Sequence, residues 1–281
     1  MTKLIFGTGQ YKYRVEDPFG ILPTGMTWGN VSHVAVDSSD RVYAFQRKDP
    51  PIIVFDSEGN YLNSWGDGDL IDAHGIFVTD DDKLFVVDRD MYQVLKYTLD
   101  GELLLTIGVR GKSALQAPFN HPADVAVSPA GDIYVADGYG NSLIHKFSAT
   151  GEHLLSWGAP GNQKGQLTTP HGIWVDSKSK VYVADRENNC IQVFTENGEL
   201  ITQWLNFYHP MDIWEDKYGV FYVTDQVPRF IILDSEGTIL ARGRAPEAGH
   251  GIYGDSQGNL YLSASLRGVV KLRRLNNKEL G

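Results

Sequence analysis

Three of the eight histidines stand at matching places in the sequence. His74, His171 and His250 each precede by 14 residues the end of a predicted strand in a repeated segment of the chain. Three imidazoles that meet at one point, with a fourth position left open, are the ligand set of a catalytic metal ion. The spacing therefore predicts a metal site with zinc as the first expectation, and the same donor set also accepts iron, cobalt or manganese.

The other histidines differ from these three. Two of them stand 16 residues before their strand ends and are followed by Pro, which favours a turn, and two fall in predicted outer strands. The histidines that we assign to structural roles are His121, His145, His153 and His209. In their units the ligand position is held by Ala123 and Met211. His33 stands 14 residues before Arg47, so it could be a fourth ligand or a residue that orients one.

Further polar side chains end the predicted inner strands. Asp recurs at one position of the repeat, which indicates turn capping; these residues are Asp88, Asp137, Asp185 and Asp225. Arg47, Arg89, Tyr139 and Arg186 lie beside that position. Arginines around a metal ion suggest an anionic ligand that is held by guanidinium groups and polarised by the cation.

A repeat must position these residues. A short apolar strand, an Asp/Gly-rich turn and a second strand return six times, every 38 to 50 residues, and most copies continue into two more strands. Four short strands per unit are typical of propeller blades, whereas a β-sandwich has no reason to repeat one unit six times. The sequence predicts an all-β, six-bladed β-propeller as a single domain over residues 1–281. The segment from Lys3 to Val15 is expected to complete the last blade and close the ring.

Composition limits the partners. The chain has 281 residues, with 25 Lys+Arg against 35 Asp+Glu and a formal net charge of −10. This charge disfavours nucleic acid, and no apolar stretch reaches the roughly 18 residues that a membrane span needs. The amino terminus lacks the apolar core of a secretory signal. Because Cys190 is the single cysteine, no intrachain disulfide can form, and we expect a cytoplasmic protein. The arginines around the predicted metal site indicate a small anionic substrate.

Several segments carry a family resemblance. They are DGYGNSLIHKF from Asp137, PHGIWV from Pro170, VADRENNCIQVF from Val183, AHGI at His74, AFQRKD at Arg47 and GHGI at His250. Across all six units the sequence resembles peptidyl-α-hydroxyglycine α-amidating lyase, the lyase half of the peptide-amidating enzyme, which is built on NHL-type repeats.

The resemblance implies a zinc ion on His74, His171 and His250. It further implies a carbinolamide substrate, which is split into an amide and glyoxylate. Tyr139 would then be the base that takes the hydroxyl proton, with Arg186 beside it, and Arg47 would bind the substrate carboxylate.

The sequence also departs from the family. The family has Asp after the third histidine, which helps to hold a structural calcium ion with two backbone carbonyls, here those of Val34 and Ile76. Gly251 stands in place of that Asp, so the sequence does not favour calcium. Gly140 and Asn189 stand near two positions of disulfide cysteines in the secreted animal enzymes. His33 and Arg89 are expected to reshape the pocket for a smaller or differently charged substrate.

Two alternatives remain at this stage. The same metal site could activate water, which would make the protein a hydrolase. The chain could instead be a non-catalytic NHL propeller that serves as a binding scaffold.

Overall fold

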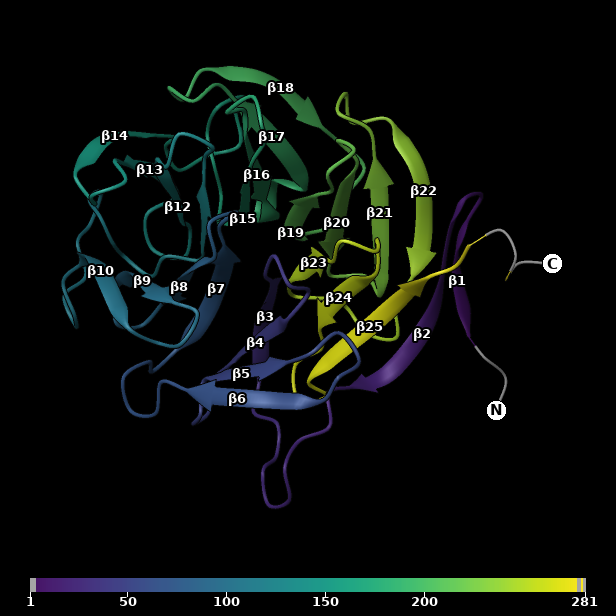
Figure 1. The fold of residues 1–281 in the computed structure, drawn as a ribbon. Helices are drawn as coiled ribbons and strands as arrows, with labels where there is room; N and C mark the ends of the chain where they lie inside the picture. The colour runs from purple at the N-terminus through teal and green to yellow at the C-terminus, as the bar shows by residue number, and fades with distance from the viewer. Residues whose placement is uncertain (1–3, 277–278, 280–281) are drawn as a thin grey trace.

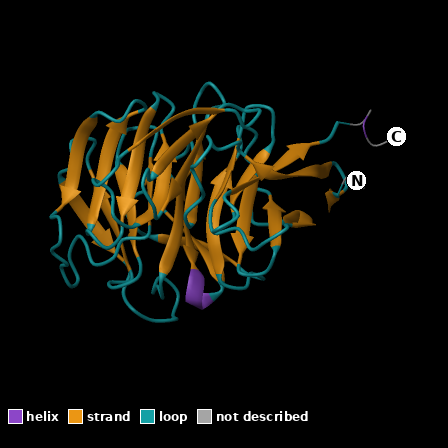
Figure 2. Cartoon of the chain, turned by 90° about the horizontal axis from the view of Figure 1, so that it is seen from below, coloured by secondary structure: helices purple, strands orange, loops and turns teal. Residues whose placement is uncertain are grey.

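Six antiparallel sheets surround a central axis in the computed structural model, which describes residues 4–276 and 279 (Figure 1). Five sheets have four strands and the sixth has five. The predicted all-β, six-bladed propeller is therefore confirmed. The sheets stand next to one another around the ring (Figure 2). Buried side chains of neighbouring blades pack between them.

In blades 1 to 5 the four strands follow the chain from the innermost strand outward. Blade 6 differs, because it also contains β1 and β2. Blade 1 consists of β3 (Val31–Val36), β4 (Val42–Gln46), β5 (Ile52–Phe55) and β6 (Tyr61–Trp65). Blade 2 consists of β7 (Ala73–Val78), β8 (Lys83–Asp88), β9 (Gln93–Thr98) and β10 (Leu103–Gly108). Blade 3 consists of β11 (Asp124–Val127), β12 (Ile133–Asp137), β13 (Leu143–Phe147) and β14 (His153–Trp157).

The last three blades include the ring closure. Blade 4 consists of β15 (Pro170–Val175), β16 (Val181–Asp185), β17 (Cys190–Phe194) and β18 (Leu200–Trp204), with the 3-10 helix η1 (Arg186–Asn188) after β16. Blade 5 consists of β19 (Pro210–Glu215), β20 (Phe221–Asp225), β21 (Arg229–Leu233) and β22 (Ile239–Arg244). Blade 6 consists of β23 (Ile252–Gly254), β24 (Leu260–Ser263), β25 (Val269–Arg274), β2 (Tyr11–Phe19) and β1 (Ile5–Thr8).

The turn between the two inner strands of a blade is held by an Asp side chain. In blade 4, Asp176 Oδ1 accepts the backbone N–H groups of Lys178 and Lys180, both at 2.8 Å, and Oδ2 accepts the hydroxyl of Tyr182 at 3.1 Å. An Asp that bonds the backbone two residues later is the usual device of a tight turn. The same contacts recur in other blades, which explains why this turn sequence repeats along the chain.

The Asp residues at the ends of the second strands also have the predicted structural role. Asp88, Asp137, Asp185 and Asp225 are fully buried, and each accepts a backbone N–H from the loop that leads into its own blade. They fix the connection between successive blades, because a buried carboxylate must be hydrogen-bonded.

The amino-terminal hairpin closes the ring. β2 pairs with β25, from Tyr13 opposite Arg274 to Phe19 opposite Val269, so chain segments from both ends share blade 6 (Figure 1). The predicted closing segment is thus found, although Lys3 lies outside the described residues. Among the residues described, no helix is long and apolar enough to cross a membrane.

Candidate metal centre

An extra residue near the start of the inner strands turns the candidate ligands to the axis. In β7, Ala73 pairs with Asp88 but Ile76 already pairs with Val86, so β7 has one residue more than its partner over this stretch. β15 has the same irregularity between Pro170 and Ile173. Such bulges redirect side chains and are frequent beside active sites.

His74, His171 and His250 meet on the axis. They come from blades 2, 4 and 6, and their ring centroids are 5.0, 4.9 and 4.7 Å apart. One nitrogen of each ring lies within 4.8 Å of the others, and the rings of His74 and His171 are almost fully buried. The structure thus brings together the three histidines that the spacing had grouped.

The backbone of the intervening blades orients these rings. His74 Nδ1 donates to the Ala123 carbonyl and His171 Nδ1 donates to the Met211 carbonyl, both at 2.7 Å. A carbonyl can only accept, so in the neutral rings Nε2 carries the free lone pair. The Ser32 carbonyl has the same place beside His250, with poorer geometry. Metal-ligating histidines commonly have such a partner on the other nitrogen.

The electrostatics keep all three rings neutral. Burial and the neighbouring imidazoles hold the pKa values of His74 and His171 well below the usual range. Burial and the charge on His33 lower the pKa of His250 to about 3. Because a metal ion binds the unprotonated imidazole, this donor set fits zinc or another divalent transition metal.

Tyr139 lies directly against this group. Its hydroxyl is 3.0 Å from Nε2 of both His74 and His171. Arg186 donates from Nη1 to the same hydroxyl at 3.4 Å, and the guanidinium groups of Arg89 and Arg186 lie 5.1 and 5.4 Å from the centre of the phenol ring. Two cations therefore flank a phenol that contacts the candidate metal ligands.

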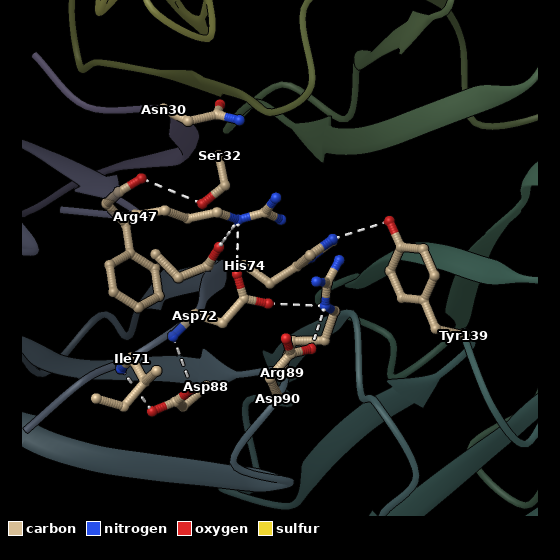
Figure 3. Close-up of polar contacts among 12 residues, drawn as sticks. Asn30, Ser32, Arg47, Ile71, Asp72, His74, Asp88, Arg89, Asp90 and Tyr139 are labelled. Atoms are coloured by element: carbon tan, nitrogen blue, oxygen red, sulfur yellow. Dashed lines mark hydrogen bonds and ion pairs between the residues drawn. The ribbon is translucent and has the colours of Figure 1, made fainter.

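A buried carboxylate holds two arginines beside His74 (Figure 3). Asp72 contacts Nε of Arg47 at 2.9 Å and Nε of Arg89 at 2.7 Å. Arg47 Nε also donates to the Ala73 carbonyl at 3.0 Å, next to His74. These contacts use Nε, so the paired terminal nitrogens of both guanidinium groups can bind another anion. The sequence analysis did not single out Asp72.

His33 does not join the three histidines, and its expected register is wrong by one residue. Val31 pairs with Gln46, so β4 ends at Gln46 rather than at Arg47, and Ser32 takes the position equivalent to the histidines. A shift of one residue moves a strand side chain to a different level. His33 lies one level deeper on the axis, where its Nε2 is 2.9 Å from Asp212 Oδ2.

A second buried group surrounds His33. Asp124 and Asp212 come from blades 3 and 5, and one ligand atom of each lies within 4.8 Å of the others and of His33. Burial opposes protonation of His33, but the Asp212 carboxylate outweighs it and raises the pKa of His33 to about 9. Burial raises the pKa of Asp124 to about 7. The signal that could have found both acids is the Asp that follows each His-Pro pair.

The calcium ligands of the resembling family do not fit this chain. The Val34 carbonyl accepts Nδ1–H of His33 at 3.0 Å, and the backbone at Gly251 offers no carboxylate. A Cβ on Gly251 would lie 2.7 Å from Cδ2 of His33, so the imidazole fills the space of the missing side chain. Without a carboxylate at residue 251, the carbonyls of Val34 and Ile76 provide too few oxygens for Ca²⁺.

The remaining histidines have structural partners. His121 and His209 adopt positive φ values of 60° and 48°, which suits turns. His145 Nε2 is 3.1 Å from Asp137 Oδ2, and His153 lies on an outer strand. Cys190 is buried, and burial together with Asp185 raises the pKa of its thiol to about 12.

Comparison with known proteins places the repeats in a family. The NHL repeat model matches residues 119–147 and 167–194, which belong to blades 3 and 4. The human NHL repeat-containing protein 3 is 32% identical over 218 residues, a match that covers 72% of this chain and 62% of that protein. Peptidyl-alpha-hydroxyglycine alpha-amidating lyase 1 of Drosophila melanogaster is 28% identical over 244 residues, covering 81% of this chain and 43% of that protein.

Each of these matches spans less than two thirds of the relative. Among solved structures, a gluconolactonase from Xanthomonas campestris has a TM-score of 0.72 with 14% identity, covering 93% of this chain and 89% of that chain. At that identity the likeness concerns the fold alone. The chain is therefore a six-bladed propeller with NHL repeats, and its sequence relatives include the amidating lyases.

Proposed function

We propose that this protein is a metal-dependent carbon–nitrogen lyase that splits an α-hydroxyglycine-like carbinolamide into an amide and glyoxylate or a related carbonyl product. The observation that carries the proposal is the contact of the Tyr139 hydroxyl with two of three converging neutral imidazoles, beside an arginine pair. The likeness to amidating lyases supports it.

His74, His171 and His250 would hold the metal ion, for which zinc is the first candidate. When bound, such an ion polarises a substrate hydroxyl and stabilises the negative charge that develops on its oxygen. Nδ1 hydrogen bonds from His74 and His171 to backbone carbonyls keep these rings aimed at the axis.

Arg47 and Arg89 would bind the substrate carboxylate. Asp72 fixes both side chains through Nε, so their terminal nitrogens can form the paired contacts that carboxylates accept. A carboxylate held there lies next to His74, because Arg47 also bonds the carbonyl of Ala73. This arrangement would place the adjacent carbon and its hydroxyl near Tyr139.

Tyr139 would move the proton. Its oxygen, next to Arg186 and with Arg89 over the ring, would take the proton of the substrate hydroxyl. The oxygen electrons then form the carbonyl, the carbon–nitrogen bond breaks, and the nitrogen receives the proton back from Tyr139. The products are a primary amide and an α-keto acid or aldehyde acid, and no oxidant, reductant or water is consumed.

The direct test is glyoxylate release from an N-acyl-α-hydroxyglycine by the metal-loaded protein. We expect turnover that falls at least about 100-fold in Tyr139→Phe, where the proton acceptor is lost but the ring remains. His171→Ala should lose turnover together with the metal ion of the three-histidine site. His153→Ala, on an outer strand, is the matched control and should keep both.

Product analysis in 18O-labelled water separates the lyase from a hydrolase. The lyase releases an unlabelled primary amide, whereas hydrolysis of the amide releases a carboxylate that contains solvent oxygen. Unchanged activity in His171→Ala would contradict the proposal, and a protein that binds no metal and turns over no such compound would be better described as a binding scaffold.

A further inference from the structure

The group formed by His33, Asp124 and Asp212 has an architecture of its own. Its members come from blades 1, 3 and 5 and stand in register with Gly75, Gly172 and Gly251 of the other three blades. All three members are buried, with 6%, 4% and 2% of their surface exposed. The group lies one residue deeper than the candidate metal centre.

The three glycines make room for it. A Cβ would lie 2.7 Å from Asp124 Cα at Gly75, and 2.8 Å from Asp212 Cα at Gly172. At Gly251 it would lie 2.7 Å from the His33 ring. Real Cβ atoms do not approach so closely, so each glycine is required by the residue opposite it. The cluster is therefore built into alternate blades in the same way as the three-histidine site.

The hydrogen bonds of the cluster leave acceptors facing one another. Asp124 Oδ2 accepts the Ile173 N–H at 3.0 Å, and Asp212 Oδ2 accepts the Ile252 N–H at 2.7 Å. Asp124 Oδ1 is buried and has no hydrogen-bond partner among the described residues. Because Nδ1 of His33 donates to a carbonyl, the neutral ring presents a lone pair on Nε2 to the Asp212 carboxylate. At 2.9 Å a positive charge must lie between these two atoms, and it is either the proton of a charged His33 ring or a metal ion.

We propose that His33 Nε2, Asp124 Oδ1 and the Asp212 carboxylate hold a second divalent transition-metal ion on the axis. The ring of His33 is oriented as in the three-histidine site, by a bond from Nδ1 to a backbone carbonyl. One imidazole and two carboxylates suit Zn²⁺, Mn²⁺ or Fe²⁺, whereas Ca²⁺ takes six or more oxygens.

The structure also offers room for a further ligand. A cavity of about 10 Å³ borders His33, Asp124 and Asp212, and its other lining residues include Phe77 and Trp174. That volume is about the minimum for one water molecule. A water there would complete a four-coordinate site, and a cavity of that size is too small for a substrate, so the ion would be structural.

Metal stoichiometry tests this proposal independently of catalysis. The protein, purified without a tag, is dialysed against Zn²⁺ or Mn²⁺, freed of excess metal and analysed for metal per chain. We expect two ions in the wild type and one in Asp124→Asn, which keeps the bond to Ile173 but loses the anionic ligand. His171→Ala should also retain one ion, and Asp81→Asn, an exposed carboxylate, should retain two.

The outcomes are distinct. One ion per chain in the wild type, removed by His171→Ala, would show that a proton on His33 fills the place and would overturn the proposal. Two ions in the wild type, one in His171→Ala and none in the double variant with Asp124→Asn would support it. If Asp124→Asn does not fold, His33→Gln provides the same comparison. Loss of activity in His171→Ala with one ion retained would support the proposed function and the deeper site together.

Discussion

The two nitrogen atoms of each candidate ligand histidine have different roles. Nδ1 of His74 and of His171 is bonded to the backbone of the next blade, and Nε2 faces the shared centre. Burial makes these rings poor bases, so they remain neutral where an exposed histidine would gain a proton. Burial therefore keeps these imidazoles in the neutral form that can bind a metal ion.

The low pKa of His250 makes the stability of the metal-free protein depend on pH. In the folded state the pKa is about 3, whereas in the unfolded chain the ring takes up a proton below about pH 6.5. The stability that arises from this difference is fully present above pH 6.5 and is lost as the pH falls toward 3. Between pH 7.5 and pH 5, His250 alone should account for about 2 kcal/mol.

Urea titrations at the two pH values measure this effect. The wild type should lose more free energy of unfolding than His250→Gln by that amount, and the difference between the two proteins removes the contribution of the carboxylates. His153→Ala serves as the control for a histidine on an outer strand. Equal losses in the wild type and His250→Gln would refute the assignment.

At the scale of elements, strand ends and bulges determine where side chains point. The carboxylate that ends the second strand ties the incoming loop to its blade, as Asp185 does through the Thr168 N–H at 2.7 Å and through the side chains of Asn188 and Gln192. The extra residue in β7 and β15 then turns His74 and His171 inward. The site depends on both devices.

Replacing Asp185 with Ala should destabilise blade 4 without removing a metal ligand. The substitution leaves the Thr168 N–H without its acceptor and removes one acceptor from each of the Asn188 and Gln192 amides, a loss of about 2–4 kcal/mol in the free energy of unfolding. Chemical denaturation measures it, with the exposed Asp100→Ala as control. A variant as stable as the wild type would show that the loop has another anchor.

At the scale of the whole molecule, we expect the ring to unfold as one cooperative unit. Large buried side chains such as Phe119, Phe194 and Tyr182 pack between blades, so no sheet has a core of its own. The closing strand β2 adds Tyr13, which is fully buried against Phe230 and accepts a bond from Arg274 at 2.7 Å. The last blade is complete only with the amino-terminal hairpin.

Tyr13→Ala should therefore weaken the entire ring. The cavity left by the side chain predicts a loss of about 3–5 kcal/mol, comparable with other large aromatic truncations. Circular dichroism and tryptophan fluorescence should shift together in urea, because opening the closure exposes every blade. The exposed Tyr218→Ala is the control. Separate transitions for the two probes would indicate that blade 6 unfolds alone.

Much of the site was predictable because equal spacings in the repeat correspond to equivalent positions in the blades. His74, His171 and His250 share one spacing, and that spacing survives folding because blades 2, 4 and 6 have the same length between the inner turn and the strand end. The same spacing gave the wrong position for His33. Blade 1 ends its second strand one residue earlier than the sequence suggested, and a single residue decides the level at which a side chain lies.

The sequence by itself determined the six-bladed ring, its closing strand and the three histidines on the axis, because each follows from a local sequence pattern that recurs along the chain. Only the tertiary structure decided that Asp72 clamps two arginines, that Tyr139 contacts His74 and His171, and that His33 pairs with Asp212. Most of these contacts join residues of different blades. No local pattern records them, because their distances depend on how the closed ring sets one blade against another.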